Sequence, residues 1–166
     1  MRFWTWLKMY CRVALFSAIF ASFAAALLIP ESGLEAEMSI ECLGCVCEAT
    51  TRCNLNYNCT QGLCGPLLIS EPYWFDAGRP VIDGDNPTWT GAFYRCVTDP
   101  VCAGVTVRKY MVKYRQDCNG DRRIDCEDFA RIHYYGGYKC YKSLEGTKYW
   151  RQFRECRSAT NQFGQK

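Results

Sequence analysis

The chain has 166 residues, of which 49% are hydrophobic, 22% charged and 15% aromatic, and its formal net charge is +3. This length and composition indicate a single domain of ordinary size with a packed core, and they exclude a disordered chain. The small net charge provides no basic stripe, which excludes charge-driven nucleic-acid binding and broad attraction to anionic membranes.

The N-terminal residues have the pattern of a secretory signal peptide. Three basic residues among the first twelve precede an almost unbroken apolar run over 13–29. Small residues place the cleavage site within 26–36, and cleavage after Ala36 leaves 17 basic and 15 acidic residues. Since a run of about 17 residues is also near the minimum for a membrane span, an uncleaved signal anchor is the alternative. We predict a signal over 1–36, one domain over 37–166, and a secreted, extracellular protein without stable membrane association.

The chain has 13 cysteines, and Cys11 falls inside the predicted signal peptide. The remaining even number, in a secreted domain, indicates up to six disulfide bonds. Cys42 and Cys45 have the spacing of zinc ligands, but no second pair with that spacing follows and the chain has one histidine. We therefore predict a disulfide framework for these cysteines.

The first half of the domain is predicted to contain one helix followed by turns and loops. Ile40–Thr51 has cysteines and apolar residues at near-helical spacing, which indicates a short helix. Residues 52–65 are rich in Asn, Gly and Cys, as is typical of a cross-linked turn region. We expect a short strand and a loop over 66–75, and an exposed loop over 76–90.

The second half is predicted to be mostly helical. Residues 93–114 have a helical pattern that is interrupted at Asp99-Pro100, a plausible cap and first-turn pair for a new helix. A further helix is expected over about 125–133, ending before Gly136, and a last one over about 144–156. The predicted fold class is α+β, mainly α, in a small disulfide-rich single domain.

Several motifs in order between residues 40 and 157 carry a family resemblance. They are Cys42-Leu-Gly-Cys45-Val-Cys47-Glu-Ala with Cys53, then Cys64-Gly-Pro, Tyr73-Trp74-Phe-Asp76-Ala-Gly78, Asp117-Cys-Asn-Gly-Asp121, Asp125-Cys126, Phe129-Ala-Arg-Ile-His133 and Gly136-Gly137. Each motif alone is weak, but together they resemble the invertebrate-type (i-type) lysozyme family, also called the destabilase family.

The resemblance implies a lysozyme-like fold with a sugar-binding cleft and no cofactor. It implies hydrolysis of β-1,4 glycosidic bonds in bacterial peptidoglycan or a related oligosaccharide, in antibacterial defence or digestion, and isopeptide cleavage in some members. It also implies six disulfide pairs: Cys42–Cys126, Cys45–Cys156, Cys47–Cys53, Cys59–Cys64, Cys96–Cys102 and Cys118–Cys140.

Both catalytic positions of the family lack a carboxylate in this chain. A glycosidase needs a carboxylic acid and a second carboxylate about 5–10 Å away. The family's acid is a glutamate three residues after the third cysteine of the first motif, where this chain has Thr50. The family's second carboxylate is an aspartate just after the fifth cysteine, but the residues after Cys59 are Thr60, Gln61, Gly62 and Leu63. A hydroxyl is not a proton donor near neutral pH, so we predict weak or lost hydrolysis.

Other residues could supply hydrolytic chemistry. Glu48 and Asp76 are the fallback carboxylates, although on a helix Glu48 points about 160° away from Thr50. For Asp76, a structural role in its loop is the favoured alternative. The resemblance implies that His133 lies near the cleft with a serine in isopeptidase-active relatives, and the alternative is a helix-end contact with backbone. The hypotheses are therefore a non-catalytic sugar-binding protein, an active enzyme, and an interaction module unrelated to sugars.

Three further sets of residues are candidate sites. Tyr73, Trp74 and Trp150 could stack on sugars or belong to the core. Asn58-Cys59-Thr60 fits the glycosylation motif, although a bridged cysteine would lower its use. Calcium-loop spacing is found at Asp117, Asn119, Asp121, Asp125 and Asp128. Since this loop lacks the usual glycine and final glutamate, we expect weak calcium binding or a disulfide-bound turn without metal.

Overall fold

The computed structural model describes residues 38–163, so the predicted signal peptide and Cys11 lie outside the described residues. The described residues belong to one unit, Ala36–Lys166. None of the helices in this part of the chain is long and apolar enough to cross a bilayer.

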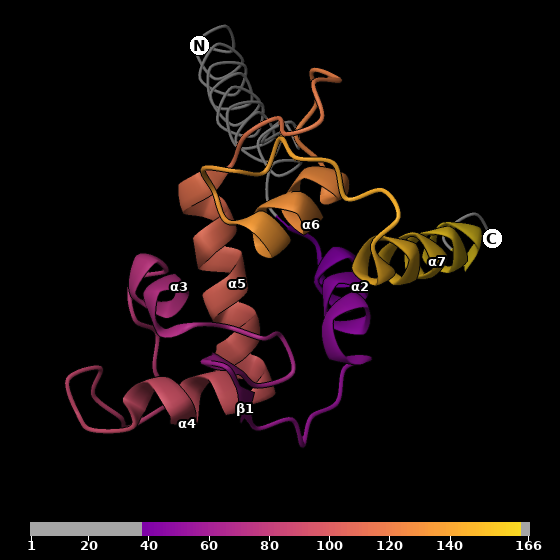
Figure 1. The fold of residues 1–166 in the computed structure, drawn as a ribbon. Coiled ribbons are helices and arrows are strands. Elements are labelled where there is room, and N and C mark those ends of the chain that lie inside the picture. The colour runs from indigo at the N-terminus through magenta and orange to yellow at the C-terminus, as the bar shows by residue number, and fades with distance from the viewer. Residues whose placement is uncertain (1–37, 164–166) are drawn as a thin grey trace, which may run out of the picture. The chain divides into compact units, whose positions relative to one another are not determined.

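The described residues form six α-helices and a two-stranded antiparallel sheet (Figure 1). In chain order these are α2 (Ile40–Thr51), β1 (Cys59–Thr60), β2 (Leu63–Cys64), α3 (Glu71–Asp76), α4 (Ala92–Thr98), α5 (Pro100–Tyr114), α6 (Cys126–Tyr135) and α7 (Lys148–Phe163). The predicted fold class, a small and mainly α domain of the α+β type, is confirmed.

Local caps account for the helices whose ends agree with the sequence pattern. Helix α2 has the predicted bounds, and the Ser39 side chain accepts from the Cys42 N–H at its start. The predicted break in 93–114 separates α4 from α5 at Asp99, whose carboxylate accepts from the Cys102 N–H. Helix α6 begins after Asp125. The Asp128 carboxylate accepts from the Asp125 N–H, which completes a capping box.

Two segments differ from the predicted pattern. Residues 66–75 were expected to form a strand and a loop, but they contain the first residues of helix α3, with Ser70 as its N-cap and a proline in its first turn. The last helix begins at Lys148 and not at 144, because Gly146 has a φ of 79° and Thr147 accepts from the Trp150 N–H. It also continues beyond Cys156 to Phe163.

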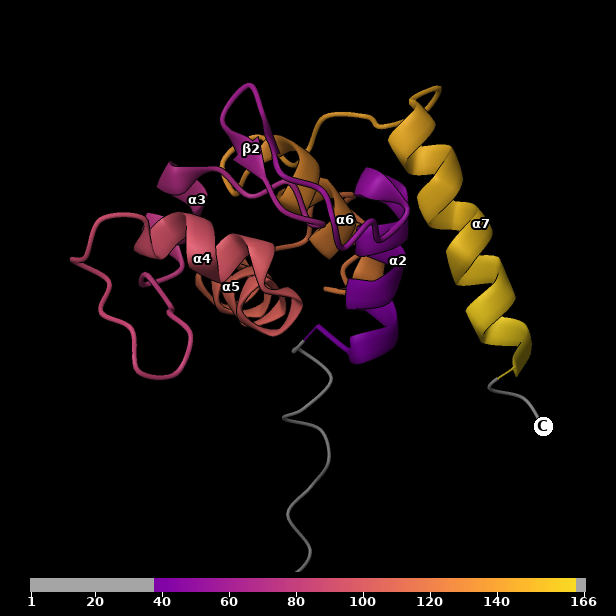
Figure 2. The same cartoon turned by 90° about the horizontal axis from the view of Figure 1, so that it is seen from below.

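The core is formed by the facing sides of α2, α5, α6 and α7. Its fully buried side chains include Val46, Val107, Met111, Ile132 and Phe153. Helices α2 and α7 lie side by side (Figure 2). Six disulfides cross-link the domain, and they are the pairs that the resemblance implies: Cys42–Cys126, Cys45–Cys156, Cys47–Cys53, Cys59–Cys64, Cys96–Cys102 and Cys118–Cys140.

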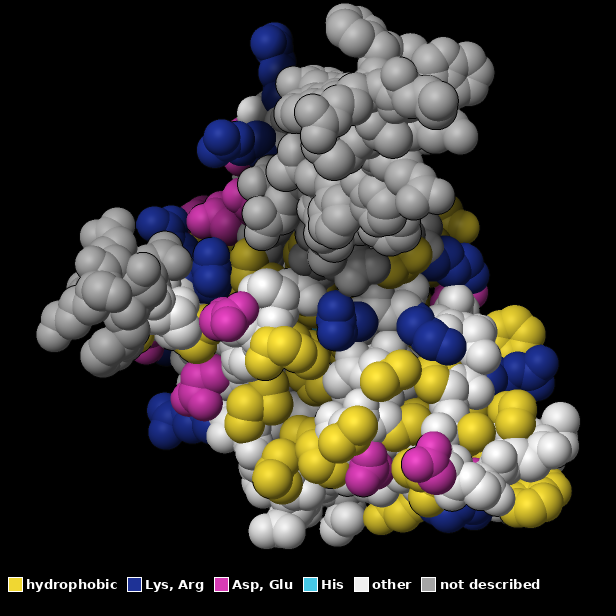
Figure 3. All heavy atoms as spheres, turned by 180° about the vertical axis from the view of Figure 1, so that it is seen from behind, with side chains coloured by type: hydrophobic (Ala, Val, Ile, Leu, Met, Phe, Trp, Pro, Cys, Tyr) yellow, Lys and Arg dark blue, Asp and Glu magenta, His cyan; other side chains and the backbone are white. Residues whose placement is uncertain are grey.

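The outer face of α5 has apolar side chains that are exposed to solvent. Val101, Val105 and Val112 recur along this helix at helical spacing and are exposed. Ile40, at the start of α2, is exposed as well. Seen from behind, hydrophobic side chains gather on the face over α5 and the start of α2 (Figure 3).

Candidate functional site

Thr50 lies in the last turn of α2, and its hydroxyl is bound to backbone. Its Oγ1 lies 2.8 Å from the Cys47 carbonyl oxygen and 2.9 Å from the Pro66 carbonyl oxygen. The neighbouring Thr51 Oγ1 donates to the same Pro66 oxygen at 2.7 Å. Two adjacent hydroxyls therefore tie the end of α2 to the segment that follows the hairpin.

The hairpin β1–β2 has the shortest of the common connections. Cys59 pairs with Cys64 and Thr60 with Leu63, so only Gln61 and Gly62 form the turn. Their φ angles are 53° and 78°, and positive φ at both central residues is the mark of a type I′ turn. The four residues between Cys59 and Cys64 include no carboxylate, and two of them form the turn.

His133, at the last turn of α6, has both ring nitrogens engaged. Its Nε2 lies 2.9 Å from the Leu67 carbonyl oxygen, and its Nδ1 lies 3.2 Å from the Tyr73 hydroxyl. Because a carbonyl can only accept, Nε2 carries the hydrogen and Nδ1 accepts from Tyr73. Burial lowers the pKa of His133 to about 4, so the ring is neutral near pH 7. This geometry is the backbone contact considered above, and none of the hydrogen bonds that His133 makes within residues 38–163 goes to a serine.

The pKa of His133 can be measured directly, because it is the only histidine in the chain. We expect its imidazole NMR signals to titrate with a midpoint near pH 4. Since an unfolded histidine takes up its proton near pH 6.5, the stability contributed by the neutral ring is complete above that pH. It is lost, by about 3 kcal/mol, as the pH falls toward 4.

His133→Gln is the matched control for this titration, because glutamine can still donate to Leu67 but does not titrate. Its free energy of unfolding should change less than that of the wild type between pH 6.5 and 4. A midpoint near pH 6.5 in the folded wild type would contradict the half-buried, neutral ring.

Trp74 and Tyr73, two of the rings that could stack on sugars or belong to the core, have packing roles. Trp74 is only 4% exposed, packs on Phe93, and donates from Nε1 to the Pro80 carbonyl at 2.7 Å. One face of Tyr73 is covered by Tyr110, with ring centroids 3.6 Å apart. Trp74 therefore lies in the core, which was the alternative for this ring, and the geometry does not favour sugar stacking for Tyr73 either. Tyr73 instead positions His133.

The fallback carboxylates have separate surroundings. Asp76 accepts from the Lys113 ammonium at 2.7 Å and from the Tyr114 hydroxyl at 2.9 Å. These bonds, that of Lys113 first, lower the pKa of Asp76, so this group is ionised near neutral pH and is no proton donor. Glu48 lines a hollow of 480 Å³ between α2 and α7, together with Arg52 and Glu155. Asp76 joins α3 to α5, so the structure does not bring the two carboxylates into one site.

The calcium-loop residues bind backbone N–H groups of their own turn. Asp117 accepts from Gly120 and Arg122, and Asp128 accepts from Cys118 and Asp125. Asn119 and Asp121 accept from N–H groups two residues further on. The backbone bonds, that of Arg122 first, lower the pKa of Asp117, and burial raises that of Asp128. Over the described range, no cluster of three or more His, Cys, Asp or Glu side chains could hold a metal ion.

Calcium binding to this turn remains a prediction, and we expect it to be weak. Titration calorimetry should detect heat only at millimolar calcium, and Asp121→Ala should remove it. The reason is that the carboxylates already accept from backbone and the loop lacks the glycine and glutamate of tight sites. A micromolar affinity in the wild type would contradict this expectation.

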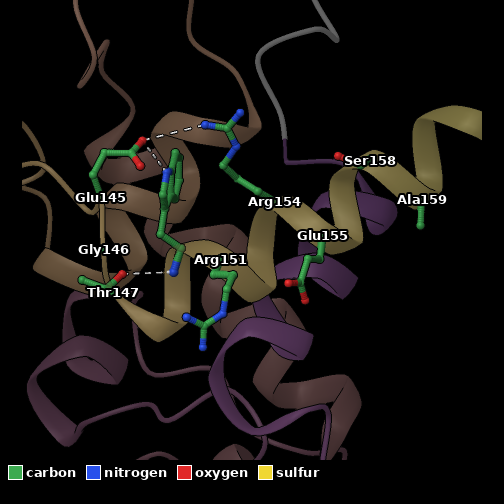
Figure 4. A pocket seen from close by; sticks show the side chains of 9 residues that line it. Glu145, Gly146, Thr147, Arg151, Arg154, Glu155, Ser158 and Ala159 are labelled. Carbon is green, nitrogen blue, oxygen red and sulfur yellow. Dashed lines mark hydrogen bonds and ion pairs between the residues drawn. The ribbon is translucent and has the colours of Figure 1, made fainter.

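A hollow with a volume of 780 Å³ lies beside the start of α7 (Figure 4). Glu145 accepts from the Trp150 Nε1 at 2.8 Å and lies 3.8 Å from the Arg154 guanidinium. Figure 4 shows Arg151 and Arg154 pointing to opposite sides, so the two cations do not converge on one ligand position. Of the residues that the sequence offers as candidate site residues, Trp150 lines this hollow, but it is only 2% exposed.

The glycosylation motif lies immediately before and within β1. Asn58 is exposed, and its Oδ1 accepts from the Tyr94 hydroxyl at 3.1 Å. Use of this site stays a prediction.

The groups that contact Thr50, His133 and Tyr73 could not be predicted from the sequence. The carbonyls of Pro66 and Leu67, which hold Thr50 and His133, have no sequence signal because every residue has a carbonyl. Tyr110, which covers Tyr73, belongs to the apolar stripe of α5 and was therefore visible only as a core residue.

Comparisons with known proteins agree with the motifs and the fold. The family model described as Destabilase matches residues 39–156. A lysozyme of Magallana gigas is 31% identical over 126 residues, covering 73% of this chain and 82% of the relative. An invertebrate-type lysozyme of Ruditapes philippinarum is 31% identical over 117 residues, covering 68% and 77%.

Solved structures show the same similarity. The crystal structure of Aeromonas hydrophila PliI in complex with Meretrix lusoria lysozyme matches with a TM-score of 0.55 and 30% identity, covering 71% of this chain and 89% of the matched chain. Tapes japonica lysozyme matches with a TM-score of 0.53 and 30% identity, covering 70% and 89%.

Proposed function

The chain belongs to the destabilase family of invertebrate-type lysozymes, and we propose that it is a secreted member that binds bacterial peptidoglycan or a related oligosaccharide and hydrolyses it weakly or not at all. Family membership and the lysozyme structures support a lysozyme-like hydrolase role. The reduced activity is inferred from the residues at the two catalytic positions.

The observation that carries the proposal is the bonding of Thr50. The family's acid must hold a proton that it can release to the leaving oxygen, which a tuned carboxyl can do and a hydroxyl cannot. Here the hydroxyl at that position is within hydrogen-bond distance of the Cys47 and Pro66 carbonyls. The side chain therefore fastens α2 to the neighbouring segment, which is a structural task.

The hairpin supports the same conclusion. Its two-residue turn leaves no acid after Cys59 to act as nucleophile or base. The loss of one positioned acid or base typically costs about 10²–10⁴-fold in rate. With both groups missing, residual activity would have to come from binding alone.

The alternative hydrolases have less support. An isopeptidase needs an activated nucleophile, but both nitrogens of His133 are bonded to Tyr73 and to the Leu67 carbonyl. An enzyme that used Asp76 as its acid would need a protonated carboxyl there, whereas Lys113 lowers its pKa. A role in antibacterial defence or digestion through binding requires neither chemistry.

Sedimentation with insoluble peptidoglycan, combined with turbidity loss of bacterial walls, tests the proposal. We expect the protein to sediment with the walls and to clear them at least about 100-fold more slowly than an active invertebrate-type lysozyme at equal concentration. A reduced and alkylated sample is the control for nonspecific sedimentation. Clearing at the rate of the active enzyme would refute the loss of activity, and absence of binding would refute the sugar-binding role.

Secretion is part of the same proposal. Expression of the full-length chain in animal cells should release it into the medium, with a new N-terminus between residues 27 and 37. Retention of the intact chain in the membrane fraction would instead support the uncleaved signal anchor.

A further inference from the structure

Trp89 is exposed to solvent. It lies in the segment 77–91 that connects α3 to α4, and it is 59% exposed. The indole is a large apolar surface whose transfer out of water is favourable, and tryptophan is among the side chains that contribute most to binding when they are covered. An exposed tryptophan on a fixed backbone is therefore a candidate for binding a ligand.

The backbone around Trp89 is fixed on both sides. Both carboxylate oxygens of Asp85, whose side chain is only 6% exposed, accept from the Arg95 guanidinium at 2.8 Å. Arg95 also donates to the Thr90 carbonyl at 2.9 Å. The Trp89 N–H donates to the Asn86 carbonyl, and the Trp89 carbonyl accepts from Ala92. Because a bidentate ion pair closes this segment, the ring has little backbone freedom to lose when it is covered.

The same segment is joined to the hairpin. Tyr94, in the first turn of α4, is 45% exposed and donates its hydroxyl to Asn58, the residue before β1. Helix α4 also contacts β2. In Figure 1 the loop before α4, α4 itself and the hairpin lie in the lower part of the view, and Figure 2 shows the loop and the hairpin extending to opposite sides of α4. Trp89 is therefore attached, through α4, to the hairpin whose turn replaces the family's second carboxylate.

We propose that Trp89 is a sugar-stacking residue that binds the apolar C–H face of an N-acetylhexosamine ring in a β-1,4-linked chain. This inference rests on the sugar-binding function proposed above and names a residue that would carry it. A pyranose ring has one face rich in C–H bonds, which matches the size and the negative face of an indole. Its hydroxyl and acetamido groups remain at the edge of the pyranose ring, away from the stacked face.

Calorimetric titration with the N-acetylglucosamine tetramer, together with sedimentation on insoluble peptidoglycan, tests this proposal. Trp89→Ala should weaken binding about tenfold or more, which is the size of effect expected for a central aromatic contact. Trp89→Phe should keep part of the affinity, because a smaller aromatic face remains. Since the ring is exposed, the thermal unfolding midpoint of Trp89→Ala should stay within a few degrees of the wild type.

Tyr141→Ala is the matched control, because it removes an aromatic ring that is 71% exposed in the segment between α6 and α7. Its affinity should stay within about twofold of the wild type. If the wild type binds and Trp89→Ala binds equally well, this inference is wrong while the proposed function stands. If the wild type does not bind sugars at all, both are wrong.

Asp85→Asn tests whether the ring acts on a fixed segment. It keeps the shape of the side chain but removes the charge that closes the ion pair with Arg95. We expect a severalfold loss of affinity with Trp89 still present, and no further loss when Asp85→Asn is added to Trp89→Ala. Additive losses in the double variant would show that Asp85 acts elsewhere.

Discussion

Thr50→Glu combined with Gln61→Asp is expected to raise the rate of wall clearing at least about tenfold above the wild-type rate, whereas each change alone should stay within about twofold of it. An acid and a second carboxylate act as a unit in glycoside hydrolysis. Each single variant still lacks one of them, so only the pair can restore the chemistry.

The structure selects position 61 for the second carboxylate. Gln61 and Gly62 form the type I′ turn, and Asp-Gly is among the preferred sequences of that turn, so Gln61→Asp keeps the hairpin. Gly62 has a φ of 78° and is best left unchanged. Thr50→Glu removes one hydroxyl from the Pro66 carbonyl, but Thr51 still donates to it. A displacement of about an ångström would limit the gain, which is why we expect tenfold and not full activity.

The uncharged pair Thr50→Gln with Gln61→Asn is the control, because it changes shape in the same way without adding carboxylates. Equal rates for the charged and uncharged pairs would show that these are not the catalytic positions. If the wild type clears walls as fast as an active lysozyme and Thr50→Val keeps that rate, Glu48 and Asp76 become the residues to mutate.

Removal of the Cys45–Cys156 disulfide should lower the free energy of unfolding by about 5 kcal/mol. This bridge joins α2 to α7 and closes a loop with a sequence separation of 111 residues, the largest among the six bridges of residues 38–163. The longer the loop that a bridge closes, the more conformational entropy it removes from the unfolded chain. Urea unfolding of Cys45→Ala/Cys156→Ala, without reductant, measures the loss.

The Cys59–Cys64 bridge supplies the comparison, since its sequence separation is only 5 residues. Its removal by the corresponding pair of alanines should cost about 2 kcal/mol. A cost equal to or greater than that of the long bridge would show that local strain or packing, and not loop entropy, decides the contribution of these disulfides.

The sequence alone determined those elements whose signals are local. The starts of α2, α5 and α6 are marked by Ser39, Asp99 and Asp125, whose side chains accept from N–H groups within three residues. The same kind of signal was present for α3 at Ser70 and for α7 at Thr147. The sequence prediction relied on apolar periodicity instead of these caps. Helix α3 has six residues, which is too short to show that periodicity. The cysteine content predicted a framework of up to six bridges, but only the family resemblance implied which cysteines pair.

Tertiary structure decided what each site residue does. The sequence showed that position 50 lacks a carboxylate, but it could not show that the Thr50 hydroxyl meets the Pro66 carbonyl or that His133 meets that of Leu67. It also could not separate Trp74, which is buried, from Trp89, which is exposed. Every residue offers a carbonyl, and an aromatic ring suits core and surface alike. The outcome is therefore fixed by which distant segments pack together, and that depends on the whole core and not on local sequence.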